Sequence, residues 1–471
     1  MRKDPQQLME AMYQKGQMLQ EAWSNMPGRA VRGYENFKRV NFLEGIEDEW
    51  KRHICAILME NQRKWYANMD ETTRTTHVGS FEKYVFPLIR AIVNNLVAAD
   101  LVSVQPLDSP SGMIFYFDVL YGSDKGDVKK GEKMYSAKRG PSSGYHYSDE
   151  LVENEFLQNG NGGAGAYTGT LAYGPSGLRA GTVEITDGTQ VVTDDGKGGL
   201  QGGGSGTVNY HTGAYSVTFS SVVGSGTAIT GTYQFDLEGS SQVPQVDLSF
   251  TSCPVVARPN KLRARWSLEG AQDMKAYHGV QTDVEITAFM ANMISKEINF
   301  KIVQHLRAVA SAGSVAFDKT KPEGISLDDH YKTFLLKIIE AKNLIFDATK
   351  RTVTPWMIGG TGCANIVEYM PGYKAFPAPK GSLGIYKAGQ LSDGTVFYKD
   401  PDFPTNEFLM GHKGTGILDT GYVHAPYIGL YTTEPVTLDD FVTRRGMATR
   451  TAQKVVNSDY YVTGTITESS P

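Results

Sequence analysis

The stretch from Ser267 to Ala310, SLEGAQDMKAYHGVQTDVEITAFMANMISKEINFKIVQHLRAVA, is the most regular helical segment of the chain. Gly279 predicts a break after a short first helix. Thr282 and Glu285 then match the S/T-x-x-E capping box that starts a new helix. The second helix is predicted to run to about Ala310, roughly 42 Å at about 1.5 Å per residue. A helix of this length can cross a whole domain.

Apolar side chains recur along this second helix in steps of three and four, which is typical of an amphipathic helix that packs on a core. The predicted ladder comprises Ile286, Phe289/Met290, Met293/Ile294, Ile298, Ile302, Leu306 and Val309.

The polar residues of the stretch raise the alternative of a metal or acid/base site: His278, Asp283, Glu285, Glu297 and His305. Asp283 and Glu285 fall in the first turn, where carboxylates favour the positive end of the helix dipole. A di-metal site in a helical scaffold needs a carboxylate three or four residues before each histidine. Neither histidine has one. The pattern therefore predicts caps and surface charge, with no catalytic residue, no metal ligand and no cofactor-binding residue.

Composition restricts the function classes. The chain has 471 residues, 40% hydrophobic and 21% charged, with a net charge of −5. This is ordinary for a folded soluble protein and excludes wholesale disorder. The negative net charge predicts no global attraction to nucleic acid or to anionic membrane. The N-terminus lacks the apolar core of a secretory signal, and no run is long and apolar enough to span a bilayer. We therefore expect a soluble protein made inside a cell, with no membrane partner.

The three cysteines, Cys55, Cys253 and Cys363, are far apart and form no C-x-x-C pair. This spacing indicates neither a zinc site nor a disulfide framework. Buried, reduced thiols are expected.

The N-terminal quarter is predicted to be helical. Leu43, Ile46, Trp50 and Ile54 lie at helical spacing. Residues 72–80 read as an exposed connection, and a second helix is expected in 86–107, with its apolar stripe through Ile89, Val93 and Leu96 and its end at Pro106. The segment GMIFYFDVLYGS, 112–123, predicts a strand.

From about residue 159 to 239 the composition shifts to Gly, Thr and Ser with short alternating apolar runs. Period-two patterning between turn residues predicts an inserted antiparallel β-module. No phosphate-binding loop is present, since DGKGGLQGGGSG does not open a helix. Asp194 and Asp195 are a weak calcium candidate, and a solvated hairpin end is the simpler reading.

After residue 240 the chain reads as extended segments and helices that alternate without a repeated βα unit, which predicts an α+β fold. Residues 326–349 are expected to be helical, with Ser326 and Asp329 as an S-x-x-D cap. Strands are expected at PWMIGG, GTVFYKD, EFLMGHKG, APYIGLYTTEPV, FVTRRGMATRT and SDYYVTGTIT.

Five segments in order along the chain resemble the major capsid protein of T-even-type tailed bacteriophages. SLEGAQDMKAYHGVQTDVEI resembles the helix, break and spine helix of that family. LVAADLVSVQPLDSPSGMIFYFDVLYG resembles the entry into its extended loop. GHKGTGILDTGYVHAPYIGLYTT and FVTRRGMATRT resemble its late return and closing strand, and ILMENQRKWY its N-terminal region. Residues 159–239 do not match the family's own insertion.

The resemblance implies an α+β tailed-phage major capsid fold. Its implied parts are an N-terminal arm with helices (1–111), an extended β-loop (112–158 and 240–266), an inserted Gly-rich antiparallel β-domain (159–239), a peripheral domain with a spine helix (267–313), an axial domain (314–430) and a C-terminal return to the peripheral domain (431–471).

The implied function is self-assembly, as hexameric and pentameric capsomers, into an icosahedral head that encloses DNA without sequence-specific binding. Portal, scaffold and decoration proteins are the implied partners, and the virion capsid, assembled in the host cytoplasm, is the implied location. A structural protein of this kind needs no catalytic site, cofactor or metal.

Alternatives remain. A compartment-forming shell protein would share the fold. The β-module offers a surface adhesion or glycan-binding role if Tyr173, Tyr210, Tyr215 and Tyr233 stack on sugars, although tyrosines that fill a thin β-core explain the alternation as well.

Two kinds of modification also stay open. The family trims an N-terminal peptide after an aliphatic-x-Glu pattern, which Leu8-Met9-Glu10 and Leu58-Met59-Glu60 fit loosely. Some shells of this fold form Lys–Asn crosslinks, but Lys125, Lys129 and Lys130 read as exposed loop lysines.

Overall fold

The computed structural model divides the chain into two compact units, residues 1–117 with 250–471, and residues 118–249. Each has its own hydrophobic core. The structure describes residues 5–27, 36, 38–46, 48–70, 97–134, 146–238, 240–350, 355–378, 383–414, 421–437 and 442–468.

The N-terminal segment forms two helices, α1 (Pro5–Ser24) and α2 (Glu49–Asp70), which pack on each other. Leu43 and Ile46 were predicted to lie in the second of these helices. They lie in the turns that precede it, yet both are buried with Trp23 in a local core. The spacing of Leu43 and Ile46 therefore indicates that both side chains are buried, and does not indicate that they lie in a helix.

The helix predicted over 86–107 falls largely outside the described residues, including its stripe of Ile89, Val93 and Leu96, as does the connection 72–80. Its described end is the short helix α4 (Ala98–Leu101). The chain then forms β1 (Ser103–Val104) before Pro106, so the helix ends earlier than predicted. Strand β1 pairs in parallel with β19.

The first sheet of the larger unit has the order β1-β19-β21-β12, with β20 also paired to β21. Strand β12 is an edge strand with the long strand β21 as its neighbour, in register from Arg258 opposite Thr451 to Ser267 opposite Val442. Proline has no backbone N–H to donate to a neighbouring strand, and an edge strand such as β12 tolerates this loss at Pro259. The strands are β12 (Arg258–Ser267), β19 (Tyr422–Thr432), β20 (Val436–Thr437) and β21 (Val442–Val455).

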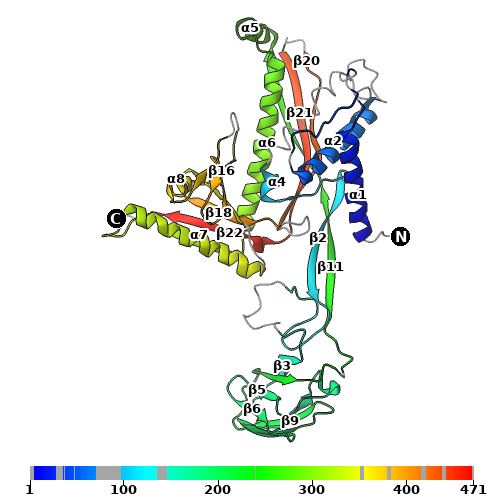
Figure 1. Ribbon diagram of the computed structural model, residues 1–471, viewed down its shortest axis with the longest axis vertical. Helices are drawn as coiled ribbons and strands as arrows, with labels where there is room; N and C mark the ends of the chain where they lie inside the picture. The colour runs from blue at the N-terminus through cyan, green and yellow to red at the C-terminus, as the bar shows by residue number, and fades with distance from the viewer. Residues whose placement is uncertain are drawn as a thin grey trace. The chain divides into compact units, whose positions relative to one another are not determined.

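Two consecutive helices follow β12, α5 (Leu268–His278) and α6 (Thr282–Val309) (Figure 1). Ser267 caps α5 by accepting a hydrogen bond from the Gly270 N–H, and Gly279 ends it in the left-handed conformation, with φ +65°. The predicted break and the predicted length of the second helix are confirmed.

The predicted capping box is wrong. Thr282 is the first residue of α6, Gln281 is the N-cap, and the buried Thr282 hydroxyl has no hydrogen-bond partner in the described part of the chain. The inner face of α6 carries Met290, Ile294, Ile298, Ile302 and Leu306, all buried against the strands.

The second sheet of the larger unit has the order β13-β22-β18-β14-β17-β16-β15. Helix α7 (Leu327–Thr349) packs on β13, β18 and β22, and α8 (Thr361–Tyr369) on β14 and β18. Ser326 is the N-cap of α7 as predicted, but its side chain makes no cap hydrogen bond. The strands are β13 (Gly313–Asp318), β14 (Pro355–Gly359), β15 (Lys374–Ala375), β16 (Tyr386–Gln390), β17 (Val396–Lys399), β18 (Glu407–His412) and β22 (Tyr461–Thr467), the last preceded by the 3-10 turn Ser458–Tyr460.

The C-terminal segment is shared between these two sheets. Strand β21 pairs with β12 and β19, whereas β22 pairs with β13 and β18. Residues 431–471 therefore contribute strands to both sheets.

A two-stranded ribbon pairs β2 (Ser111–Tyr121) with β11 (Val246–Val256). The boundary between the two units falls within both strands. Beyond the ribbon, the Gly122 N–H donates to the Gln245 carbonyl at one end, and the Ala257 N–H donates to the Pro110 carbonyl at the other.

The smaller unit contains an eight-stranded sheet of order β3-β10-β5-β6-β7-β8-β9-β4, with antiparallel pairing throughout. It begins with β3 at Leu151, eight residues before the predicted start of the module at 159. We call this sheet and its loops the β-module. Its strands are β3 (Leu151–Asn159), β4 (Tyr167–Thr170), β5 (Glu184–Thr186), β6 (Val191–Asp194), β7 (Gly199–Gly202), β8 (Gly204–Val208), β9 (Ala214–Phe219) and β10 (Ala228–Gln234), with a 3-10 turn at Gly174–Ser176.

Candidate functional site

The five polar residues considered for a metal or acid/base site are not brought together. His278 is the exposed last residue of α5, and Glu285 is exposed in the first turn of α6. The remaining three each have a separate structural partner. Asp283 pairs with Arg445 of β21, Glu297 with Lys301, and the His305 Nδ1 lies 3.1 Å from the Tyr422 hydroxyl.

No group of three or more His, Cys, Asp or Glu side chains in the described ranges could hold a metal ion. The calcium candidate Asp194–Asp195 is occupied by its own loop. Asp194 accepts from the Gly181 and Gly196 N–H groups and from the Tyr210 hydroxyl. Asp195 accepts from the Lys197 and Gly199 N–H groups. These carboxylates fix turns, as the solvated-hairpin interpretation predicts.

The four tyrosines offered as sugar-stacking platforms are mostly interior. Tyr173, Tyr215 and Tyr233 are 5%, 5% and 0% exposed and belong to the core of the β-module. The Tyr233 hydroxyl donates to the Glu155 carboxylate, and burial raises the pKa of Tyr233. Tyr210 is half-buried against that core. Tyr173, Tyr215 and Tyr233 therefore fill the β-core and offer no exposed ring face for stacking on a sugar.

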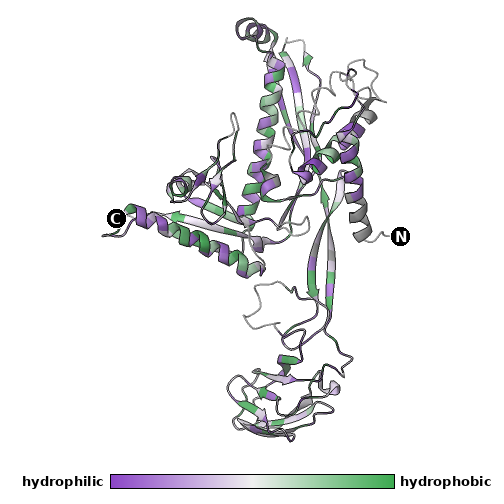
Figure 2. Ribbon diagram, viewed as in Figure 1, coloured by the Kyte–Doolittle hydropathy of each residue, from purple (hydrophilic) through white to green (hydrophobic). Residues whose placement is uncertain are grey.

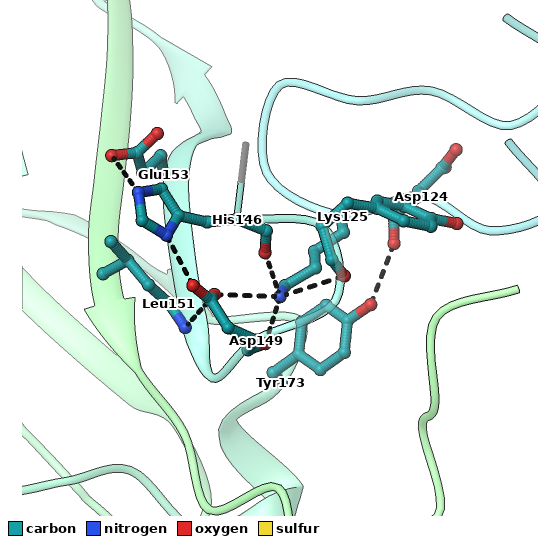
Figure 3. Close-up of polar contacts among 8 residues, drawn as sticks. Asp124, Lys125, His146, Asp149, Leu151, Glu153 and Tyr173 are labelled. Atoms are coloured by element: carbon teal, nitrogen blue, oxygen red, sulfur yellow. Dashed lines mark hydrogen bonds and ion pairs between the residues drawn. The ribbon is translucent and has the colours of Figure 1, made fainter. Parts of the chain in front are cut away.

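Lys125 was predicted to be an ordinary exposed lysine, but its side chain is only 2% exposed. Its ammonium donates to the backbone carbonyls of His146, at 2.6 Å, of Tyr147, at 3.3 Å, and of Asp149 (Figure 3). We call these three carbonyls the Lys125 cage. The Asp149 carboxylate lies 3.8 Å away. Three ammonium protons thus meet three acceptors, an arrangement that suits a structural role more than a reactive amine.

The wall of the Lys125 cage carries a histidine held between two carboxylates. His146 Nδ1 lies 2.5 Å from Asp149 Oδ2, and its Nε2 lies 3.7 Å from Glu153 Oε1. The hydrogen bond to Asp149 raises the pKa of His146. Burial lowers the pKa of Lys125, and the Asp149 charge opposes this shift. Lys129 and Lys130 are exposed, as predicted.

The predicted thiols and cleavage patterns are only partly as expected. Cys55 and Cys363 are buried, as expected, but Cys253 on β11 is partly exposed. Leu58, Met59 and Glu60 lie within α2 and are buried, so a protease cannot reach this pattern in the folded chain. Leu8–Glu10 lie in α1, and their side chains are outside the described ones.

The outer face of α6 is also apolar. Phe289, Met293 and Phe300 belong to the exposed arc of the helix and are 58%, 39% and 40% exposed. We call these three residues the α6 stripe. The apolar period predicted that Phe289 and Met293 belong to the buried ladder. This prediction is wrong, because both side chains are exposed on the isolated subunit. Two apolar faces on one helix indicate one face for the subunit's own core and a second for another surface.

The ribbon presents a second exposed apolar row. Val246 and Leu248 lie at alternate positions of β11, hence on one face of the strand, and both are exposed. Apolar residues recur along both ribbon strands (Figure 2). A two-stranded ribbon is marginal in water by itself, so its apolar face needs a covering surface. Sequence patterning could not separate these residues from core residues.

None of the described helices combines the length and apolarity that a bilayer crossing requires.

Comparison with known proteins is consistent across most of the chain. Residues 78–470 match the model of the family described as major capsid protein Gp23. The chain is 25% identical over 374 residues to the major capsid protein of Enterobacteria phage T4, covering 74% of this chain and 70% of that protein. It is 25% identical over 415 residues to the major capsid protein of Salmonella phage ViI, covering 82% and 81%.

Among solved structures, the chain is similar to the capsid of Myoviridae phage XM1, with TM-score 0.32, 9% identity, and coverage of 66% of this chain and 89% of that one. It is also similar to the mature capsid of bacteriophage PhiM1, with TM-score 0.35, 7% identity, and coverage of 50% and 78%. Since the family model spans residues 78–470, the chain belongs to the Gp23 family of major capsid proteins, the structural proteins of phage heads.

Proposed function

We propose that this protein self-associates as hexamers and pentamers that close into an icosahedral head around phage DNA. The observation that carries the proposal is the second apolar face of α6, the α6 stripe, which a single subunit leaves in water. Burying a large apolar side chain contributes about 1.5–3 kcal/mol. Three such residues on one rigid helix are a sufficient anchor for contact between copies.

The ribbon gives a second contact in the same assembly. Its exposed pair Val246 and Leu248 fits an arm that lies on a neighbouring subunit. The β-module then braces adjacent subunits or decorates the shell. The buried positions of Tyr173, Tyr215 and Tyr233 remove the main support for a glycan-binding role. The protein acts as a structural subunit and not as an enzyme, with portal, scaffold and decoration proteins as partners.

Electron microscopy and analytical sedimentation of the protein, produced with its scaffold, test the proposal. Wild type should form capsomers and closed shells. F289D/F300D places two charges on the α6 stripe and should leave folded subunits that do not assemble. The matched control is V222D, an equally exposed apolar position in the β-module that is 56% exposed. It should assemble normally.

A wild-type protein that stays monomeric with its scaffold would overturn the shell function. Normal shells from F289D/F300D would show instead that the α6 stripe is not a contact between copies.

A further inference from the structure

The edge strand β12 carries a row of three basic residues, Lys261, Arg263 and Arg265, which we call the basic row. They lie at alternate positions, so they share one face of the sheet, with successive Cα atoms about 6.8 Å apart. All three are exposed. None of them has a carboxylate partner in the described ranges of the chain.

The face that carries the basic row is the one that α6 does not cover. Arg445 lies opposite Ala264 and donates to Asp283 and Thr287 of α6. The face shared by Ala264 and Arg445 is therefore the one under the helix. Lys261, Arg263 and Arg265 alternate with Ala264 along the strand, so they point away from α6.

Elsewhere in this unit, positive side chains near the sheets are used in ion pairs. Arg307 pairs with Glu407, Lys296 with Asp402, and Arg445 with Asp283.

The net charge is also distributed unequally between the two units. Residues 118–249 contain 15 acidic and 8 basic residues, net −7, whereas the other unit contains 36 acidic and 38 basic, net +2. The basic row thus belongs to the less acidic unit.

The chemistry of the face indicates what it binds. The residues of β21 directly opposite Lys261, Arg263 and Arg265 are Ala448, Gly446 and Arg444. Protein–protein interfaces rely on buried aromatic or aliphatic anchors and are depleted in charge at their centre. The three residues of the basic row supply no such anchor, in contrast to the α6 stripe. A row of exposed cations instead suits a phosphate backbone, which needs charge but no apolar pocket.

Charged residues on an edge strand also discourage edge-to-edge pairing. That role requires charge at the edge but sets no condition on the neighbouring strand. Here the charges of Lys261, Arg263 and Arg265 have one sign, share one face and are all exposed, which edge protection does not require.

We propose that the basic row contacts the phosphate backbone of the enclosed DNA, independently of base sequence, so that this face of the β1-β19-β21-β12 sheet is turned toward the lumen of the head. The proposal rests on the shell function above. The net charge of −5 predicted no overall attraction to nucleic acid. A local, sequence-independent contact with DNA phosphates is compatible with that negative charge.

The test compares two triple variants that lose the same charge. K261Q/R263Q/R265Q removes the basic row. K332Q/K337Q/K350Q removes three lysines of and beside α7 that already pair with Asp329, Glu340 and Asp347. Binding to two short DNA duplexes of unrelated sequence is followed by fluorescence anisotropy between about 50 and 200 mM NaCl. Thermal melts check that both variants remain folded.

Wild type should bind both duplexes alike, with an affinity that falls as salt rises. Loss of three phosphate contacts should reduce the slope of log K against log salt by about 2.7. The control should keep the wild-type slope. The inference is overturned if wild type shows no salt-dependent binding, if both variants weaken equally, or if the basic-row variant binds DNA normally and loses self-association, which would assign the row to a second copy.

Electron microscopy of the same proteins separates this inference from the shell function. If wild type forms shells but the basic-row variant binds DNA like wild type, the shell function stands and the DNA contact is rejected. If the basic-row variant loses DNA binding as expected but wild type forms no shells, the DNA contact stands and the shell function is rejected.

Discussion

Arg445 on β21 donates from Nη1 to the Asp283 carboxylate at the start of α6, at 2.7 Å, and also to the Thr287 hydroxyl, at 3.0 Å. The Arg445 side chain is 12% exposed and the Asp283 side chain 45%, so the guanidinium is largely buried while its carboxylate partner still meets solvent. Asp283 therefore ties the long helix to the sheet beneath it, a role that differs from both the catalytic and the simple capping interpretation of this residue.

Asp283→Asn should destabilise the larger unit by about 1–3 kcal/mol, because it leaves a mostly buried guanidinium without its counter-charge. Urea unfolding measures the loss. Asp329→Asn is the matched control, since Asp329 is 63% exposed and pairs with an exposed lysine of α7. Its cost should be within about 0.5 kcal/mol. Equal effects of the two variants would argue against the tether.

Lys125→Met should destabilise the β-module by several kcal/mol, on the order of 3 kcal/mol, because three carbonyls of the Lys125 cage lose their donor while remaining crowded. Limited proteolysis of the intact chain, with the cleavage sites mapped by mass spectrometry, should show cuts in residues 146–149 before cuts elsewhere. Lys129→Met, on the same loop but exposed, should behave like wild type. Unchanged protection in Lys125→Met would show that the cage is dispensable.

His424 should make the larger unit sensitive to acid. It is 1% exposed on β19, and burial lowers its pKa to about 4. The folded-state pKa lies below the unfolded value of about 6.5, so neutral His424 is compatible with the fold above that pH. Stability should then fall as pH drops from about 6.5 toward 4, by up to about 3 kcal/mol.

Thermal melts of wild type and His424→Gln at pH values across this window check the expectation. The variant should lose less stability on acidification than wild type does. His211→Gln, at an exposed position in the β-module, should leave the wild-type pH dependence intact. A parallel pH dependence for wild type and His424→Gln would exclude this residue as the cause.

Gly279→Ala should cost about 1 kcal/mol, because the junction between α5 and α6 holds φ at +65°. Among the described residues, apart from the chain neighbours of Gly279, none has an atom within 4 Å of a Cβ built there, so the cost is conformational and not steric. Gly279→Asn should cost less, since asparagine tolerates the left-handed region better than alanine. Urea unfolding of both variants measures the difference. An alanine variant as stable as wild type would show that the junction relaxes.

Local sequence rules predicted much of this fold where a structure depends on neighbouring residues. The left-handed Gly279 and the length of α6 follow from a glycine and a regular apolar period. The capping box failed by one position, because whether Thr282 precedes or begins the helix depends on the path of Val280 and Gln281. The α+β class is confirmed, since helices and mixed sheets occur as separate layers.

Non-local relationships could not be predicted in the same way. The segment around Lys125 is polar and charged, like any solvent loop, and the carbonyls that bury the lysine lie 21 to 24 residues further along the chain. Phe289 and Met293 have the spacing of core residues, but periodicity reports only that a side chain avoids water. It does not report whether the covering surface belongs to the same chain.

The neighbouring strands β2 and β11 carry the chain into the β-module and out of it again. Where they end, the Gly122 amide and the Gln245 carbonyl are joined by a 2.7 Å hydrogen bond, so a short turn between these residues would close a plain hairpin. The chain between Gly122 and Gln245 is therefore an insertion whose two ends lie close together. A different domain joined at Gly122 and Gln245 would meet the same closely spaced chain ends.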